Sequence, residues 1–237
     1  ISPLTAAAVY VTAALTFSAL ARSQAATLPL LMGAALYCPL HFYLPRPFGL
    51  RRRPKVRGLP VNRFFYVLAH ELSHALAALV SGVRIRKINV GKNGGCVVMN
   101  ATNAFISLAP YFIPFYALAA GLACGLASFF LDMAPYRPFF TGATGFFLAF
   151  HLLHTGDILS GPVQSDLKKA GGLLFSLSVI VLLNSLCLAA ALKLIFPDLI
   201  SLRRYSAGVW TGAGTIAGWL FMAVSYVFNT VKPYFQP

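Results

Sequence analysis

The sequence contains few charged residues, and acidic residues are the scarcest among them. Only 10% of the 237 residues are charged and 58% are hydrophobic, whereas roughly 25% of a soluble globular protein is charged. Asp and Glu together number five, and Glu71 is the only glutamate. This composition excludes an ordinary soluble domain and is typical of an integral membrane protein.

Cysteine is also sparse, and its positions are dispersed. The four cysteines are Cys38, Cys96, Cys124 and Cys187, and no two of them form a Cys-x-x-Cys pair. This spacing argues against both a disulfide framework and a thiolate metal site. The sequence also lacks internal repeats and low-complexity tracts.

Long uncharged stretches separate the few charged residues. They cover residues 1–21, 23–45, 93–131, 138–156, 170–192 and 205–231. A transmembrane helix needs about 20 mostly apolar residues. Together with one apolar segment that does carry a charge, the stretches predict spans at 4–20, 26–45, 60–82, 104–131, 138–158, 173–196 and 208–229. The expected fold is therefore an all-α polytopic membrane protein with about seven transmembrane helices.

The net charge is strongly positive, at +14, because 19 Lys and Arg residues outnumber the five acids. In a membrane protein such an excess is typical of loops that contact anionic lipid headgroups. We therefore expect the lipid bilayer as a partner and no nucleic acid. Lys and Arg divide almost evenly between alternate loops, so the positive-inside rule predicts no orientation.

Residues 60–82 hold the motif His-Glu-x-x-His, formed by His70, Glu71 and His74. On a helix, positions i and i+4 lie on one face, so both imidazoles can bind one Zn²⁺ while Glu71 lies beside the water that attacks a substrate. Ionisable groups cost about 2.5–3.5 kcal/mol each inside a bilayer, so they usually line a functional cavity. The motif predicts His70 and His74 as metal ligands and Glu71 as the catalytic base.

The segment after the motif predicts a short membrane-associated β-hairpin at about 83–100. Its Val and Ile residues flank a Lys-Asn-Gly-Gly turn signal. Such a hairpin could hold an unwound substrate by strand addition. The next span contains Pro110 and Pro114, which predict a kinked or broken helix.

These residues resemble a known family. The stretch "HELSHALAALVSG", followed by the hairpin-like segment and a proline-containing span, resembles the site-2 protease class of intramembrane zinc metalloproteases, the M50 peptidases. Together, "HELSHALAA", "NAFISLAPYFIPFY" and "QSDLKKAG" are similar to the bacterial M50 metallopeptidase-like group. The resemblance covers about residues 60–190. It implies a zinc metalloendopeptidase of the bacterial inner (plasma) membrane that cleaves transmembrane segments of other membrane proteins.

The resemblance also suggests how the chain is organised. Residues 1–59 would form two leading transmembrane helices and a basic linker, and residues 60–196 the metalloprotease core. Residues 197–237 would form a C-terminal transmembrane helix. The oligomeric state is not predicted.

The third zinc ligand is less clear, because catalytic zinc typically takes three protein ligands and the class's Asn-x-x-Pro…Asp-Gly pattern is absent here. The candidates are Asp166, His151, Asp157 and His154. Asp166 is favoured because it lies in the resembling "QSDL" block, after Gly161 and Pro162, which can break a helix and let the chain fold back. If spans 60–82 and 138–158 run in the same direction, His151 is level with the motif. Asp157 would then lie roughly 9 Å beyond His151 along the helix.

Two other functions fit the same residues. One is a non-proteolytic zinc-binding membrane scaffold, which the missing Asp-Gly pattern favours. The other is a proton-linked transporter in which His and Asp residues form a relay.

Overall fold

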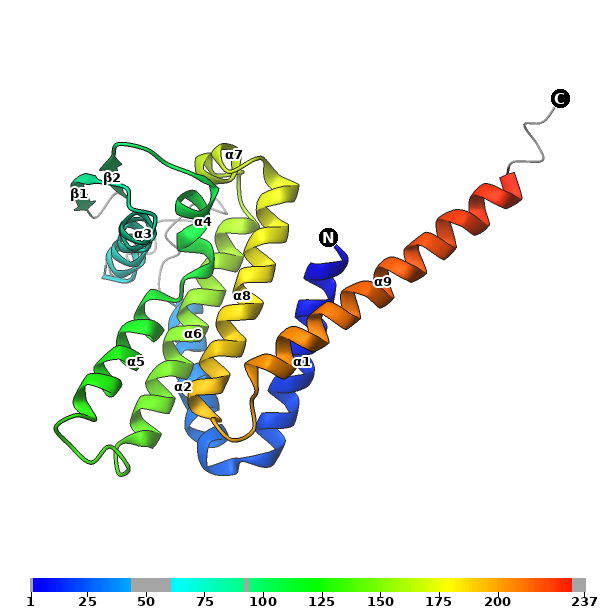
Figure 1. Ribbon diagram of the computed structural model, residues 1–237. Coiled ribbons are helices and arrows are strands. Elements are labelled where there is room, and N and C mark those ends of the chain that lie inside the picture. The colour runs from blue at the N-terminus through cyan, green and yellow to red at the C-terminus, as the bar shows by residue number, and fades with distance from the viewer. Residues whose placement is uncertain (1, 44–60, 92–93, 232–237) are drawn as a thin grey trace. The chain divides into compact units, whose positions relative to one another are not determined.

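The computed structural model describes residues 2–43, 61–91 and 94–231 (Figure 1). The chain divides into two compact units, one of residues 20–176 and one of residues 1–19 with 177–237. The division at residues 59 and 196 expected from the sequence is not tested by these units and stays a prediction.

The described residues form nine helices and one β-hairpin. The helices are α1 (Pro3–Arg22), α2 (Gln24–Tyr43), α3 (Val61–Val80), α4 (Ala104–Phe112), α5 (Phe115–Ala127), α6 (Arg137–Leu159), α7 (Ser165–Lys169), α8 (Leu173–Ile195) and α9 (Leu202–Val231), and the strands are β1 (Ile85–Gly91) and β2 (Gly94–Met99).

In the unit of residues 1–19 and 177–237, small residues and buried hydroxyl groups join α1, α8 and α9. Its core consists of Ala7, Ala8, Ala189, Tyr205 and Val209. The Thr12 hydroxyl lies 3.2 Å from the Tyr205 hydroxyl and 3.4 Å from the Ser185 carbonyl oxygen. Small residues allow apolar helices to approach closely, and such hydrogen bonds stabilise them inside a membrane.

Among the described residues, three helices are long and apolar enough to cross a membrane: α1, α8 and residues Leu202–Thr230 of α9. A fourth span is possible if α4 and α5, which are bent by 77° at their junction, cross as one. The apolar part of α3, Phe64–Val80, is shorter than these spans, and α6 carries histidines and an aspartate along its length. The candidate spans indicate an integral membrane protein, but the predicted number of seven is not confirmed.

The break predicted from the two prolines lies between α4 and α5. Pro110 is inside α4, and Pro114 is the residue before α5. Proline lacks a backbone N–H and clashes with the preceding turn, so it bends or ends a helix. The predicted span over 104–131 is therefore two helices.

In the unit of residues 20–176, α2 and α6 pack closely and run in the same direction. A Cβ atom added to Gly33 would collide with the Gly142 carbonyl, and one added to Gly145 would collide with the Leu30 carbonyl. Further along the same helices, Tyr37 contacts Phe150. Glycine therefore permits the close approach that brings the end of α2 beside the end of α6.

Helices α3, α4 and α7 gather with the hairpin at one end of this unit (Figure 1). The hairpin predicted at 83–100 is confirmed as an antiparallel pair in which Ile88 lies opposite Val97. Helix α6 ends at Leu159, and α7 begins only five residues after Ser160, at Ser165. The chain thus breaks where Gly161 and Pro162 predicted it, and α7 packs against α4.

Candidate metal centre

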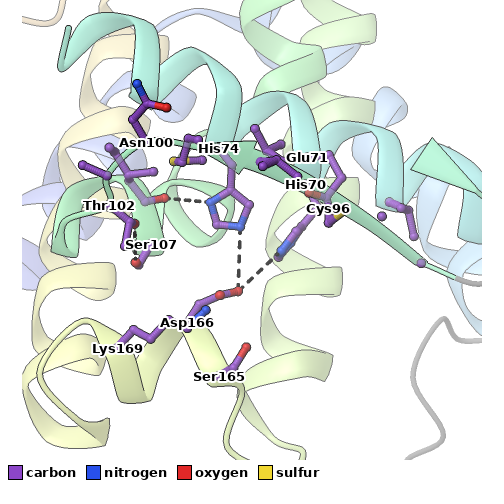
Figure 2. Close-up of a pocket in the computed structure, with 18 of the residues that line it drawn as sticks. His70, Glu71, His74, Cys96, Asn100, Thr102, Ser107, Ser165, Asp166 and Lys169 are labelled. Carbon is purple, nitrogen blue, oxygen red and sulfur yellow. Dashed lines mark hydrogen bonds and ion pairs between the residues drawn. The ribbon is translucent and has the colours of Figure 1, made fainter. Parts of the chain in front are cut away.

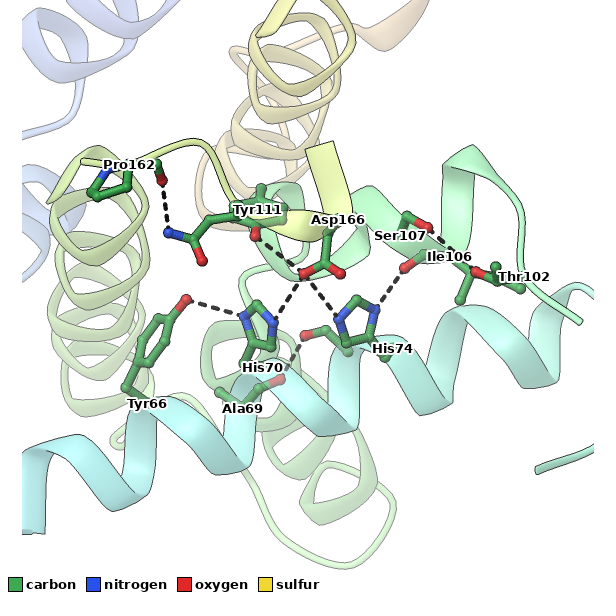
Figure 3. Close-up of polar contacts among 12 residues, drawn as sticks. Tyr66, Ala69, His70, His74, Thr102, Ile106, Ser107, Tyr111, Pro162 and Asp166 are labelled. Atoms are coloured by element: carbon green, nitrogen blue, oxygen red, sulfur yellow. Dashed lines mark hydrogen bonds and ion pairs between the residues drawn. The ribbon is translucent and has the colours of Figure 1, made fainter. Parts of the chain in front are cut away.

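Side chains from α3 and α7 converge at this end of the unit (Figure 3). The Asp166 Oδ2 atom lies 3.7 Å from His70 Nε2 and 3.8 Å from His74 Nε2. One ligand atom from each of these residues lies within 4.8 Å of the others. Within the described part of the chain, they form the one group of three such side chains that could hold a metal ion.

The spacing of these atoms fits a zinc site. Zinc binds His nitrogen and carboxylate oxygen at about 2.0–2.2 Å, so tetrahedral ligand atoms lie about 3.3–3.5 Å from one another. The two distances from Asp166 to the histidines exceed this by only a few tenths of an ångström. Two histidines and one carboxylate form a donor set typical of catalytic zinc.

The other three candidates for the third ligand lie elsewhere. His154 Nδ1 is 3.1 Å from the Tyr37 hydroxyl. Asp157 Oδ2 is 3.2 Å from His41 Nε2. His151 lines a separate cavity of about 20 Å³, which His70 also borders. The structure therefore brings Asp166, and none of these three residues, into the cluster.

Pro110 explains how His74 is held. In a helix the Ile106 carbonyl would accept from the N–H of residue 110, but proline has none. That carbonyl lies instead 2.8 Å from His74 Nδ1. Because a carbonyl can only accept, Nδ1 carries the proton and Nε2 is left with its lone pair facing Asp166. The helix-breaking residue thereby sets the tautomer that a metal ligand needs.

A Pro110→Ala substitution should therefore weaken zinc binding. Alanine would supply an N–H that competes with His74 for the Ile106 carbonyl, and loss of such an outer partner typically costs about 10–100-fold in metal affinity. Competition with a coloured chelator measures the change. Pro138→Ala, in the first turn of α6, is the matched control. Equal zinc affinity in both variants would contradict this role for Pro110.

His70 is held by a residue one turn earlier on α3. The Tyr66 hydroxyl lies 3.1 Å from His70 Nδ1 (Figure 3), and the tyrosine is 7% exposed. If His70 binds a metal through Nε2, then Nδ1 donates its proton to this hydroxyl. Each histidine thus has a buried oxygen partner behind it, as metal-binding histidines usually do.

Asp166 is positioned by both of its neighbouring elements. The adjacent Leu167 is 2% exposed, and its carbonyl accepts a hydrogen bond from the Ser176 hydroxyl. The Tyr111 hydroxyl donates to Asp166 Oδ2 over 3.3 Å. Burial alone would raise the pKa of the Asp166 carboxyl, but the two histidines beside it outweigh burial and hold the pKa below its usual range. The carboxylate is therefore ionised at neutral pH, as a metal ligand must be.

Glu71 lies against the hairpin. Its side chain is 6% exposed, and a Cβ atom added to Gly95 would lie 2.5 Å from Glu71 Cγ and 2.8 Å from the Asn89 carbonyl oxygen. No larger residue fits at position 95 without moving one of them. The absence of a side chain at Gly95 thus lets β2 pack directly on the predicted base.

A pocket of about 750 Å³ surrounds the cluster (Figure 2). It is bordered by α3, strand β2, the start of α4 and helix α7. Polar side chains line it beside the motif and Asp166, including Asn100, Thr102, Ser107, Ser165 and Lys169. This lining can admit water to the predicted ligands.

Several contributing residues were not identified from the sequence. Tyr66 lies four residues before His70, which is a helical spacing that could have indicated it. Tyr111 had no such signal, because its contact with Asp166 joins α4 to α7. The Ile106 carbonyl is a backbone group, and only Pro110 four residues later hinted that it lacks a helical partner.

An integral membrane protein with this motif and a carboxylate in one pocket has the arrangement of a membrane metallopeptidase. Residues 52–160 match the family model described as Peptidase M50B-like. This match supports membership of the M50 peptidase family, which is generally zinc-dependent, and it agrees with the resemblance expected from the sequence. No curated protein and no solved structure gives a significant match to the chain.

Proposed function

We propose that this protein is a zinc-dependent intramembrane protease that hydrolyses peptide bonds in or near transmembrane segments of other membrane proteins. The observation that carries the proposal is the convergence of His70, His74 and Asp166 beside Glu71 in one pocket. The match of residues 52–160 to the M50B-like family model supports it. By the same resemblance, we propose the plasma membrane of a bacterium as its location.

The chain's own groups suffice for the proton transfers of hydrolysis. Zinc held by the three ligands would supply a Lewis acid that activates water and polarises the substrate carbonyl. The Glu71 carboxylate takes a proton from the water as it attacks. It then returns a proton to the nitrogen of the leaving amine.

A substrate helix has its carbonyls hydrogen-bonded internally, so it must unwind before water can attack. Strand β2 lines the pocket from Gly94 to Met99 and packs on Glu71 through Gly95. An extended segment added to this strand would lie beside the base and the ligands. We therefore assign the hairpin the role of a substrate clamp.

Breaking the hairpin should reduce cleavage without removing zinc. An Ile88→Pro substitution deletes a backbone N–H in β1 opposite Val97, and proline disrupts a strand ladder. Ile88→Thr keeps both the N–H and the branched side chain, so it is the control. Cleavage and zinc content are measured on the same samples. Unchanged cleavage by the proline variant would exclude the clamp.

The proposed function is tested in liposomes. Purified protein is reconstituted with a panel of single-span membrane proteins, and fragments are identified by mass spectrometry. We expect cleavage within or next to the span, loss of cleavage with a zinc chelator, and recovery on adding Zn²⁺. A protein that holds zinc but cleaves no member of a broad panel would favour a scaffold. One that holds no zinc would contradict the proposal.

A further inference from the structure

A second buried polar cluster joins α2 to α6. It contains Tyr37 and His41 from α2, and His154 and Asp157 from α6. Tyr37 and His41 are each 2% exposed, and His154 is 1% exposed. Buried polar groups cost free energy unless they are bonded, so their presence here calls for a role.

The contacts in this cluster fix the His154 ring. The Tyr37 hydroxyl lies 3.1 Å from His154 Nδ1. The ring of His41, paired with Asp157 at 3.2 Å, meets the His154 ring edge-on with centroids 5.1 Å apart. The buried Nε2 atom of His154 has no hydrogen-bond partner within the part of the chain that the structure describes. Two residues of α2 therefore restrain the ring from one side.

The same ring reaches the metal centre through stacking. His154 lies between two aromatic rings, with its centroid 4.5 Å from Phe150 and 5.1 Å from Tyr66. Its plane is tilted by only 22° and 20° from theirs. The Tyr66 hydroxyl in turn lies 3.1 Å from His70 Nδ1. Contacts thus run without a break from Tyr37 through His154 and Tyr66 to a predicted zinc ligand.

We propose that Tyr37, His41 and Asp157 are positioning residues for the metal centre. They fix the His154 ring, the ring fixes Tyr66, and Tyr66 holds His70 with Nε2 toward Asp166. This gives a function to α2, which lies before the segment that matches the M50 family model. The inference rests on the proposed zinc site and adds the residues that tune its affinity.

Tyrosine-to-phenylalanine variants test the inference, because they remove a hydroxyl and keep the ring. Zinc affinity is measured by chelator competition for Tyr37→Phe, Tyr66→Phe and the double variant. We expect Tyr66→Phe to lose about 10-fold or more, as for a direct partner of a ligand, and Tyr37→Phe to lose less. If Tyr37 acts through Tyr66, the double variant should bind no more weakly than Tyr66→Phe alone.

A role in helix packing alone would give a different result. In that case Tyr37→Phe would lower the unfolding temperature of the metal-free protein and leave zinc affinity unchanged. This result would overturn the inference. Additive losses in the double variant would also overturn it. Tyr10→Phe, at a residue 74% exposed, is the matched control. The visible absorption of Co²⁺-loaded protein should shift for Tyr37→Phe and not for this control.

A second variant covers the case in which Tyr37→Phe fails to fold. Asp157→Asn weakens the pair with His41 at nearly constant volume and should also lower zinc affinity. A wild-type protein without zinc would overturn the proposed function itself. The inference alone would be overturned if His70→Ala abolishes zinc binding but Tyr66→Phe, Tyr37→Phe and Asp157→Asn leave zinc affinity unchanged.

Discussion

Replacing Asp166 by alanine is expected to abolish stoichiometric zinc binding. The carboxylate lies between the two motif histidines, 3.7 and 3.8 Å from their Nε2 atoms. Without it two imidazoles remain, and catalytic zinc typically requires three protein ligands. We expect affinity to fall by more than the roughly 100-fold upper range for outer-shell partners. Metal content per chain in purified protein measures this, with His70→Ala as the positive reference.

The comparison with other acids makes the experiment decisive. Asp198→Ala removes an exposed acid and should leave one zinc per chain. Asp157→Asn should weaken binding without abolishing it, because Asp157 pairs with His41 outside the cluster. Full zinc content in Asp166→Ala, or complete loss in Asp157→Asn, would show that the third ligand is assigned wrongly.

A Glu71→Gln substitution is expected to stop hydrolysis while zinc stays bound. The amide keeps the shape of the side chain and its fit against Gly95, but it cannot take a proton from water. General acid–base groups contribute about 10²–10⁴-fold to rate, so cleavage should fall by at least that much. The initial cleavage rate in liposomes and zinc content are measured together.

The matched control for this change is Asp198→Asn, which also converts an acid into an amide. It should leave both cleavage and zinc content unaltered. Cleavage by Glu71→Gln at the wild-type rate would mean that another group takes the proton. Loss of zinc from this variant would mean that Glu71 supports the metal site rather than the chemistry.

The sequence predicted those parts of the fold that depend on local signals. The turn signal predicted the hairpin, Pro110 and Pro114 predicted the break between α4 and α5, and Gly161 and Pro162 predicted the return of the chain before α7. The number of spans was harder to predict. Hydropathy treats each apolar segment alone, whereas α3 and α6 carry polar side chains that pack within the protein.

The site was only partly readable for a similar reason. The motif places His70, Glu71 and His74 on one helical face by spacing alone. Asp166 lies far along the chain, and its approach depends on the packing of α7 against α4. Tyr111 and the cluster of Tyr37, His41 and His154 depend on contacts between helices, which single-sequence patterns do not encode.

The return of the chain after α6 has a consequence for biosynthesis. The helix with the motif is complete long before the ribosome reaches Asp166, because the hairpin and the three helices α4, α5 and α6 are made in between. A nascent chain at that stage carries two of the three proposed ligands. The order of synthesis would thus keep the enzyme inert during membrane insertion, when unfolded segments of its own and of neighbouring chains are most exposed to cleavage.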